Sequence, residues 1–235
     1  MTVQPDATRK SLINTAIVGL QAAGLWTKCD ALYVVAAHTE QAAQLNWKVP
    51  GTRTLTKVNT PTFTVDRGYT GNGSNTGIHS NVNVAIYASA YTQNSCHIAC
   101  WNLTNTDANV GDVGDGVGNL HINARTTNEI RGRVQDATGF PAGIANTDSR
   151  GHYLLSRTAS NLTTFYKNAG SLGTHANASV AINASMKFEL GWAPALTSST
   201  NRQQAAFSLG AGLNGTEVTA FYNILLAYLQ GVGAV

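Results

Sequence analysis

The chain has 235 residues, of which 43% are hydrophobic and only 11% charged, and its formal net charge is +3 at pH 7. This hydrophobic content excludes a disordered polymer, and the scarcity of charged residues argues against a helical bundle. The few lysines and arginines are scattered, which argues against nucleic-acid binding, because that function needs a concentrated basic surface.

The first predicted element is a helix between Asp6, which can cap its start, and Gly24, which can end it. Polar residues interrupt the apolar stretch, so we expect a retained helix rather than a signal peptide, and no membrane insertion. Residues 1–29 would form a helical segment that packs on the rest of the chain or on a neighbouring subunit. Its apolar stripe consists of Leu12, Ile13, Ala16, Ile17 and Leu20.

Residues 30–235 carry strand and turn patterns and are expected to form one domain. Ala31–Ala37 indicates a strand, and Thr39 can cap the single helical turn that follows. The glycine-rich run Thr60–Ser80 predicts consecutive tight turns between strands. Alternating apolar and polar residues predict two further strands, Val82–Tyr91 and Ser95–Asn102.

The three cysteines, Cys29, Cys96 and Cys100, are expected to be buried free thiols. Cys96 and Cys100 are four residues apart in a predicted strand, roughly 13 Å, which exceeds the reach of a disulfide. Free thiols are consistent with folding in a reducing cytoplasm, and the spacing does not suit zinc.

A glycine-rich loop over Thr104–Gly118 contains several oxygen-bearing side chains. These groups could hold Ca²⁺, or they could simply form turns with their own backbone. Their spacing does not match an EF-hand, and we favour the plain loop. The candidate ligands are Asp107, Asn109, Asp112 and Asp115.

Two alternating strands on either side of Thr126–Asn128 predict a hairpin with one apolar and one polar face. If the strand Ser95–Asn102 joins the same sheet, His97 and Trp101 extend the polar face. Such a face suits a polysaccharide, but antiparallel sheets commonly expose one polar side, so a face toward solvent or a symmetry-related subunit is the favoured interpretation. The glycan-binding candidates are His97, Trp101, His121, Asn123, Arg125, Arg131 and Arg133.

The second half of the chain continues with strands and ends in a helix. Thr216 can cap a helix over Thr216–Gln230, Gly231 can end it, and its apolar stripe comprises Val218, Phe221, Leu225 and Leu229. The expected strands are Gly151–Thr158, Asn161–Asn168, Ser171–His175, Met186–Trp192 and Ala205–Gly212.

Four segments carry motifs in a familiar order: Thr60–Ser80, Leu162–Thr174 (LTTFYKNAGSLGT), Phe188–Gly191 (FELG) and Phe207–Glu217. Together they resemble concanavalin A-like (laminin-G-like) jelly-roll domains, particularly those of bacteriophage virion proteins. In one departure from that pattern, Asn168-Ala169-Gly170 replaces an Asn-Gly pair, which implies a longer turn. The resemblance implies a mainly β protein: an antiparallel β-sandwich over residues 30–235, with an N-terminal and a C-terminal helix.

Glycoside hydrolases of this fold use paired carboxylates, and the glutamates of this chain are isolated. We therefore expect no enzyme, but a phage fibre, spike or decoration protein with a lectin-like domain for host-surface polysaccharide. It would assemble in the host cytoplasm into the virion, as a homo-oligomer beside other virion proteins. The alternatives are a purely architectural virion protein, whose polar face makes subunit contacts, and a glycan-active enzyme. The isolated glutamates are Glu40, Glu129, Glu189 and Glu217.

Overall fold

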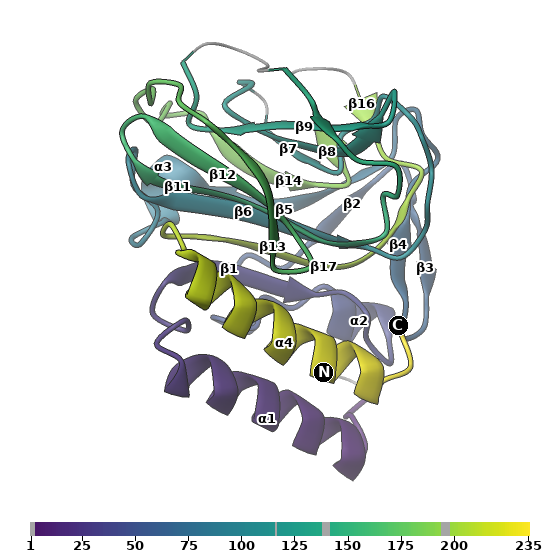
Figure 1. The fold of residues 1–235 in the computed structure, drawn as a ribbon. Coiled ribbons are helices and arrows are strands. Elements are labelled where there is room, and N and C mark those ends of the chain that lie inside the picture. Colours follow the sequence, from purple (N-terminus) through teal and green to yellow (C-terminus); the bar gives the residue numbers. More distant parts are fainter. Residues whose placement is uncertain (1–2, 116, 138–141, 194–197) are drawn as a thin grey trace.

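The computed structural model describes residues 3–115, 117–137, 142–193 and 198–235. They form a sandwich of two antiparallel sheets, with two long helices lying side by side beneath one of them (Figure 1). The predicted fold class is thus confirmed: a mainly β sandwich with an N-terminal and a C-terminal helix. No helix among the described residues is long and apolar enough to cross a membrane.

The larger sheet has eight strands and lies between the other sheet and the helices. Its order is β13-β12-β11-β6-β17-β4-β3, and β1 also pairs with β17. The strands are β1 (Cys29–Val34), β3 (Thr62–Thr64), β4 (Gly68–Thr70), β6 (Cys96–Asn102), β11 (Gly151–Ala159), β12 (Leu162–Lys167), β13 (Gly170–His175) and β17 (Gln203–Gly210).

The smaller sheet has seven strands in the order β10-β9-β8-β7-β14-β5-β2, and a separate two-stranded sheet lies next to its strands β7 and β14. Its strands are β2 (Thr56–Val58), β5 (Gly77–Asn83), β7 (Val113–Gly114), β8 (Leu120–Thr126), β9 (Glu129–Val134), β10 (Ile144–Ala145) and β14 (Lys187–Leu190). The separate pair comprises β15 (Trp192–Ala193) and β16 (Ser198–Ser199).

Two hydrophobic cores follow from this layering. The first fills the space between the sheets, and alternate residues of β6, such as Ile98 and Cys100, point into it. The second lies between the larger sheet and the helices, where Ala99 and Trp101 of the same strand are buried. Because both faces of the larger sheet are covered, β6 is buried along its whole length.

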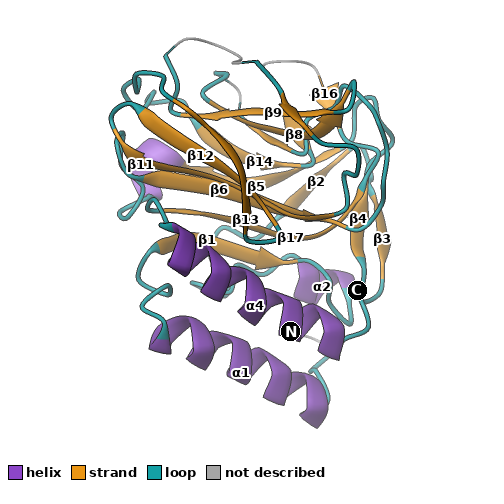
Figure 2. Cartoon of the chain, viewed as in Figure 1, coloured by secondary structure: helices purple, strands orange, loops and turns teal. Residues whose placement is uncertain are grey.

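The two long helices and one short helix lie on one side of the molecule, whereas the other short helix lies apart from them, at one end of the sandwich (Figure 2). Helix α1 (Ala7–Ala22) is capped by Asp6, as predicted, and packs against α4 (Gly215–Gly231), with the Cα of Gly19 facing Ile224. The predicted apolar stripe of α4 is buried. The short helices are α2 (Glu40–Ala43), capped by Thr39 as predicted, and α3 (Val84–Tyr87).

The structure corrects the predicted cap of α4. Asn214, not Thr216, caps the helix: its side chain accepts a hydrogen bond from the backbone N–H of Glu217 at 3.0 Å. The Glu217 carboxylate in turn accepts from the backbone N–H of Asn214 at 3.0 Å, which completes a capping box. The helix therefore starts one residue earlier than its apolar pattern indicated.

The predicted strand Val82–Tyr91 is wrong. Strand β5 ends at Asn83, and the next residues form the helical turn α3, in which Ile86 is 68% exposed. The carboxylate of Asp30, distant in sequence, accepts hydrogen bonds from the backbone N–H groups of Ser89, Ala90 and Tyr91. This contact fixes the chain away from the sheet, and no local pattern reveals it.

The turn between β12 and β13 is shorter than the resemblance implied. Lys167 pairs with Gly170, so Asn168 and Ala169 form a two-residue loop, with φ values of 48° and 68°. Positive φ at both positions is typical of the type I′ turn that suits a tight hairpin. The predicted burial of the three free cysteines is confirmed.

Candidate functional site

The structure divides the predicted polar face between two sheets. In the hairpin of β8 and β9, His121 lies opposite Arg133, and Asn123 lies opposite Arg131, so the predicted hairpin is confirmed. Strand β6, however, belongs to the larger sheet. His97 and Trp101 therefore face the helices and do not extend the face formed by the hairpin.

His97 is fully buried and makes hydrogen bonds on both sides of its ring. Its Nδ1 lies 2.6 Å from the carbonyl oxygen of Ala211, and its Nε2 lies 3.1 Å from the hydroxyl of Ser208. Burial lowers the pKa of His97 to about 4, so the imidazole is neutral at pH 7. These contacts give His97 a structural role in joining β6 to β17 and to the segment after it.

The polar face of the hairpin is largely covered. His121 is 4% exposed and Asn123 is 1% exposed, and burial lowers the pKa of His121 to about 4. Arg125 donates to Asn105 and Asn128, which leaves Arg131 as the one strongly exposed cation of the predicted set among the described residues. The hairpin therefore presents little of the open binding surface that its sequence indicated.

The loop Thr104–Gly118, called the acidic loop below, covers this face and contains β7; residue 116 is outside the described residues. Asp112 is fully buried, 2.7 Å from a guanidinium nitrogen of Arg202, and Asp115 accepts hydrogen bonds from four backbone N–H groups of residues 117–120. Asp107 accepts from the backbone of Asn128. Protein donors thus occupy these oxygens, and the described residues contain no group of three or more acidic, His or Cys side chains suited to a metal ion.

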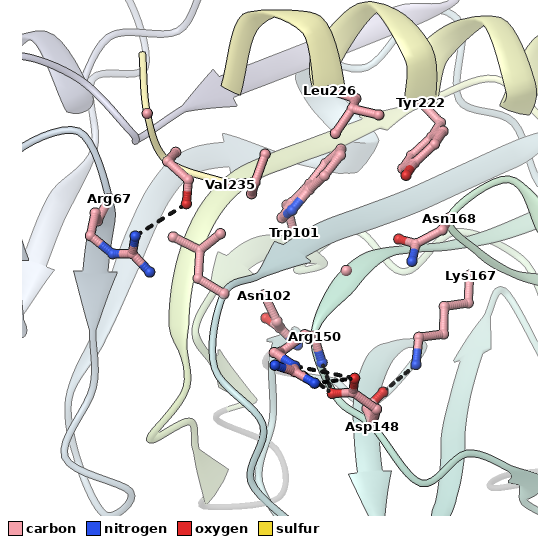
Figure 3. A pocket seen from close by; sticks show the side chains of 14 residues that line it. Arg67, Trp101, Asn102, Asp148, Arg150, Lys167, Asn168, Tyr222, Leu226 and Val235 are labelled. Carbon is pink, nitrogen blue, oxygen red and sulfur yellow. Dashed lines mark hydrogen bonds and ion pairs between the residues drawn. The ribbon is translucent and has the colours of Figure 1, made fainter. Parts of the chain in front are cut away.

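A cleft of 540 Å³ opens where β6 ends and β11 begins, beside the C-terminal half of α4 (Figure 3). The ends of three neighbouring strands form its floor, while α4 and the segment after it form one wall. Among the predicted glycan-binding residues, only Trp101 lines it. The residues around the cleft are Arg67, Trp101, Asn102, Leu103, Asp148, Arg150, Gly151, Lys167, Asn168, Tyr222, Leu226, Gly233, Ala234 and Val235.

One side of the cleft is aromatic. The rings of Trp101 and Tyr222 are nearly parallel, with centroids 5.4 Å apart, and the ring of His152 contacts both, at 5.4 Å from the indole and 6.1 Å from the tyrosine. Trp101 is only 3% exposed, whereas Tyr222 is half-buried. Because Trp101 also packs in the second core, we expect its replacement by alanine to damage folding as well as binding, so Tyr222 is the better residue to test.

The opposite side is charged (Figure 3). Asp148 and Arg150 form an ion pair at 2.9 Å, which lowers the pKa of the Asp148 carboxyl. The ammonium of Lys167 donates to the side-chain oxygen of Asn146 at 3.0 Å and to the backbone carbonyl of Asp148. Arg67 lies at another end of the cleft, beside the C-terminal segment, where it donates to the side chain of Gln203 at 2.8 Å and to the carbonyl of Ala234 at 3.3 Å (Figure 3).

Close backbone packing positions the amide of Asn168 at the cleft. Gly151 has φ +113°, and a Cβ there would lie 2.3 Å from the Asn168 side-chain oxygen, so only glycine fits. That oxygen accepts from the backbone N–H of His152 at 2.8 Å. Without a side chain at residue 151, the floor of the cleft stays open.

The floor also contains a buried donor with no acceptor. Asn102 is fully buried, and its side-chain oxygen accepts from Gln204 at 3.0 Å. Its Nδ2 has no hydrogen-bond partner among the described residues. Unpaired buried amides are uncommon, and one that lines an open cleft is a candidate ligand contact.

Sequence reasoning missed most of this cleft, because its residues come from five separate segments. The aromatic character of Trp101 was the one local signal. Lys167 and Asn168 stood in a recognised hairpin, yet that pattern does not show that α4 would pack beside them.

No protein-family model and no curated protein matches the chain. Several solved structures share its fold. Domain 4 of AbnA, a GH43 extracellular arabinanase from Geobacillus stearothermophilus solved with arabinotriose, has a TM-score of 0.53 and 14% identity; the match covers 83% of this chain and 98% of that one. Trypanosoma rangeli sialidase in complex with sialic acid has a TM-score of 0.57 and 14% identity, covering 82% of this chain and 32% of the sialidase.

A third structure comes from work on cell entry of botulinum neurotoxin type C, described as dependent on interaction with two ganglioside molecules. Its TM-score is 0.57 at 11% identity, and the match covers 86% of this chain and 52% of that one. The chain thus spans about a third to a half of the sialidase and toxin chains, and nearly all of the arabinanase domain. At these identities the similarity establishes the β-sandwich fold.

Proposed function

We propose that this chain is a non-enzymatic glycan-binding domain and that the cleft between Tyr222 and Lys167 holds the sugar. The cleft places an aromatic pair opposite charged and amide groups, and this combination carries the proposal. Sugars offer C–H faces that pack on aromatic rings and hydroxyls that pair with amides and charged groups.

The structural neighbours support a role of this kind. The arabinanase domain, which this chain matches over almost its full length, was solved with arabinotriose. The sialidase was solved with sialic acid, and the neurotoxin study concerns gangliosides. Sandwich domains of this shape thus occur in proteins that contact glycans.

A binding role fits the cleft better than hydrolysis does. Glycoside hydrolysis generally requires two carboxyl groups, one on each side of the scissile bond. Among the described residues that line the cleft, Asp148 is the one acidic side chain, and Arg150 pairs with it.

The virion setting comes from the sequence resemblance alone. We propose that the domain is displayed on a phage fibre, spike or decoration protein and contacts host-surface polysaccharide. The homo-oligomeric state expected from that setting belongs to the same proposal and is checked by light scattering.

The proposal predicts that Tyr222→Ala weakens binding of a recognised oligosaccharide about tenfold or more, because the exposed half of the aromatic pair is lost. A glycan array would first identify a ligand, and isothermal titration would then compare variant and parent. Tyr87→Ala, which removes an exposed tyrosine on α3, is the matched control and should bind normally. Unchanged affinity in a folded Tyr222→Ala protein would remove the cleft from consideration, and the absence of binding to any host polysaccharide would favour the architectural role.

A further inference from the structure

We propose that the sugar bound in this cleft is acidic and that Lys167 and Arg150 receive its carboxylate. This inference rests on the proposed function and adds the chemical class of the ligand. Its basis is the charge in the cleft, the lack of an ion pair at the partly buried Lys167 within the described residues, and the unpaired amide of Asn102.

The cleft has an excess of positive charge. The side chains of its described lining include three cations, Arg67, Arg150 and Lys167, and one acidic group, Asp148. Arg67 and Lys167 donate only to neutral oxygens, namely amide side chains and backbone carbonyls. Within the described part of the chain, neither has a carboxylate close enough for an ion pair, so a bound anion would balance this charge.

Lys167 is the cation that an anionic ligand would stabilise most. Its ammonium is partly withdrawn from water and lies 5.6 Å from the centre of the Tyr153 ring. Desolvation lowers its pKa, whereas Asp148 opposes that effect from a distance at which no ion pair forms. A ligand carboxylate beside Nζ would supply the negative charge that stabilises the protonated ammonium.

Arg150 already shows how a carboxylate fits at this place. Its Nε donates to Asp148 at 3.1 Å, and a terminal nitrogen donates to the other oxygen at 2.9 Å, a fork that matches two planar oxygens. The Arg150 side chain is 61% exposed, so it can turn toward a ligand at low cost.

The Nδ2 of Asn102 would complete the recognition. Figure 3 places Asn102 at the base of the cleft, between Trp101 and Arg150. An unpaired buried amide destabilises the protein, and a sugar or carboxylate oxygen at the floor would relieve this cost. Two cations, a neutral donor and an aromatic wall therefore meet in one cleft.

The test compares matched glycans. Polygalacturonate and polysialic acid oligomers are each titrated beside their carboxyl-reduced, neutral forms, with a sulfated oligosaccharide as a further probe. We expect the acidic form to bind about tenfold tighter, with the difference shrinking at roughly 0.5 M salt, where screening is strong. Equal binding of acidic and neutral forms, or a preference for the sulfated probe, would overturn the assignment to a carboxylate while leaving glycan binding intact.

Variants then locate the contact. Lys167→Met and Arg150→Gln should each reduce the preference for the acidic form about tenfold, because each removes one charged donor. Lys187→Met removes an exposed lysine from another strand, β14, and should leave the preference unchanged. The exposed Arg150 keeps the test valid if Lys167→Met folds poorly, and Lys167→Arg, which keeps the charge, should retain the preference. An unchanged preference in Arg150→Gln and in a folded Lys167→Met would count against the inference. No binding of any of these probes by a parent protein that binds another sugar on the glycan array would overturn the inference, whereas no binding on the array at all would refute the proposed function.

Discussion

At the scale of single residues, His152 is buried, and no hydrogen bond within the described part of the chain replaces those that its ring would make with water. It lies among the rings of Trp101, Phe221 and Tyr222, and neither ring nitrogen has a hydrogen-bond partner among the described residues. Burial, with a smaller effect from His97, lowers its pKa to about 3. A histidine of this kind packs as a neutral aromatic ring and resists protonation.

This state makes the stability of the protein depend on pH. The folded pKa lies below the usual value of about 6.5, so the unfolded chain binds more protons between those values, and stability falls as pH drops through that range. When the pH is lowered from about 7 to about 5, we expect the unfolding free energy of His152→Phe to fall by about 2 kcal/mol less than that of the parent.

Urea unfolding at both pH values measures this difference. His97 and His121 contribute in the same direction in both proteins and should cancel in the comparison. His38→Gln, at a partly exposed position, is the control. Equal losses of stability in the parent and in His152→Phe would show that His152 is protonated in the folded state without penalty.

At the scale of elements, the turn between β12 and β13 positions the polar end of the cleft. Both central residues adopt positive φ, which glycine accepts readily and alanine does not. The hairpin nevertheless holds Lys167 and Asn168 in place, because β12 pairs on its other edge with β11 and its side chains reach both cores. Tertiary pairing therefore compensates for an unfavourable turn residue.

We predict that Ala169→Gly stabilises the protein by about 1 kcal/mol, since it removes the cost of a left-handed alanine. The increase should appear in the urea midpoint with an unchanged slope. Ser171→Gly, in the exposed part of β13, should instead destabilise the protein by loosening a strand residue. A loss of stability in both variants would show that the turn does not adopt the left-handed conformation.

At the scale of the whole molecule, Arg202 joins the two sheets. It lies just before β17 of the larger sheet, and its guanidinium pairs with Asp112, next to β7 of the smaller sheet. The same group donates to the backbone carbonyls of Thr106, Ala108 and Arg125, so it also fastens the acidic loop over the hairpin. All these donors are buried.

Breaking this pair should destabilise the whole sandwich. Arg202→Met leaves the Asp112 carboxylate buried without its cation, and we expect a loss of about 3–5 kcal/mol. Asp112→Asn should cost less, since a neutral amide remains. Arg131→Met removes a surface pair with Glu129 and, as control, should change stability by about 1 kcal/mol or less. A similarly small effect of Arg202→Met in thermal or urea unfolding would show that water reaches this site.

Many of the strands and helices could be predicted because the spacing of apolar residues along the chain indicates them. Alternation every second residue located β6 and the hairpin of β8 and β9, and helical spacing located α1 and α4. The same rules failed at Val82–Tyr91, where Asp30 draws the backbone out of the sheet, and at Thr216, where Asn214 forms the cap.

The sequence by itself determined the main helices and strands, the facing of side chains within each strand, and the lack of a Cys96–Cys100 disulfide, because these depend on neighbours along the chain. The β-sandwich itself was expected from the order of motifs that resembles a known family. Only the tertiary structure decided which sheet each strand joins, and thereby separated His97 and Trp101 from His121. It also brought Lys167, Arg150 and Tyr222 into one cleft, although they belong to distant segments. Pairing between strands and the packing of α4 are contacts between parts remote in sequence, and local spacing carries no information about them.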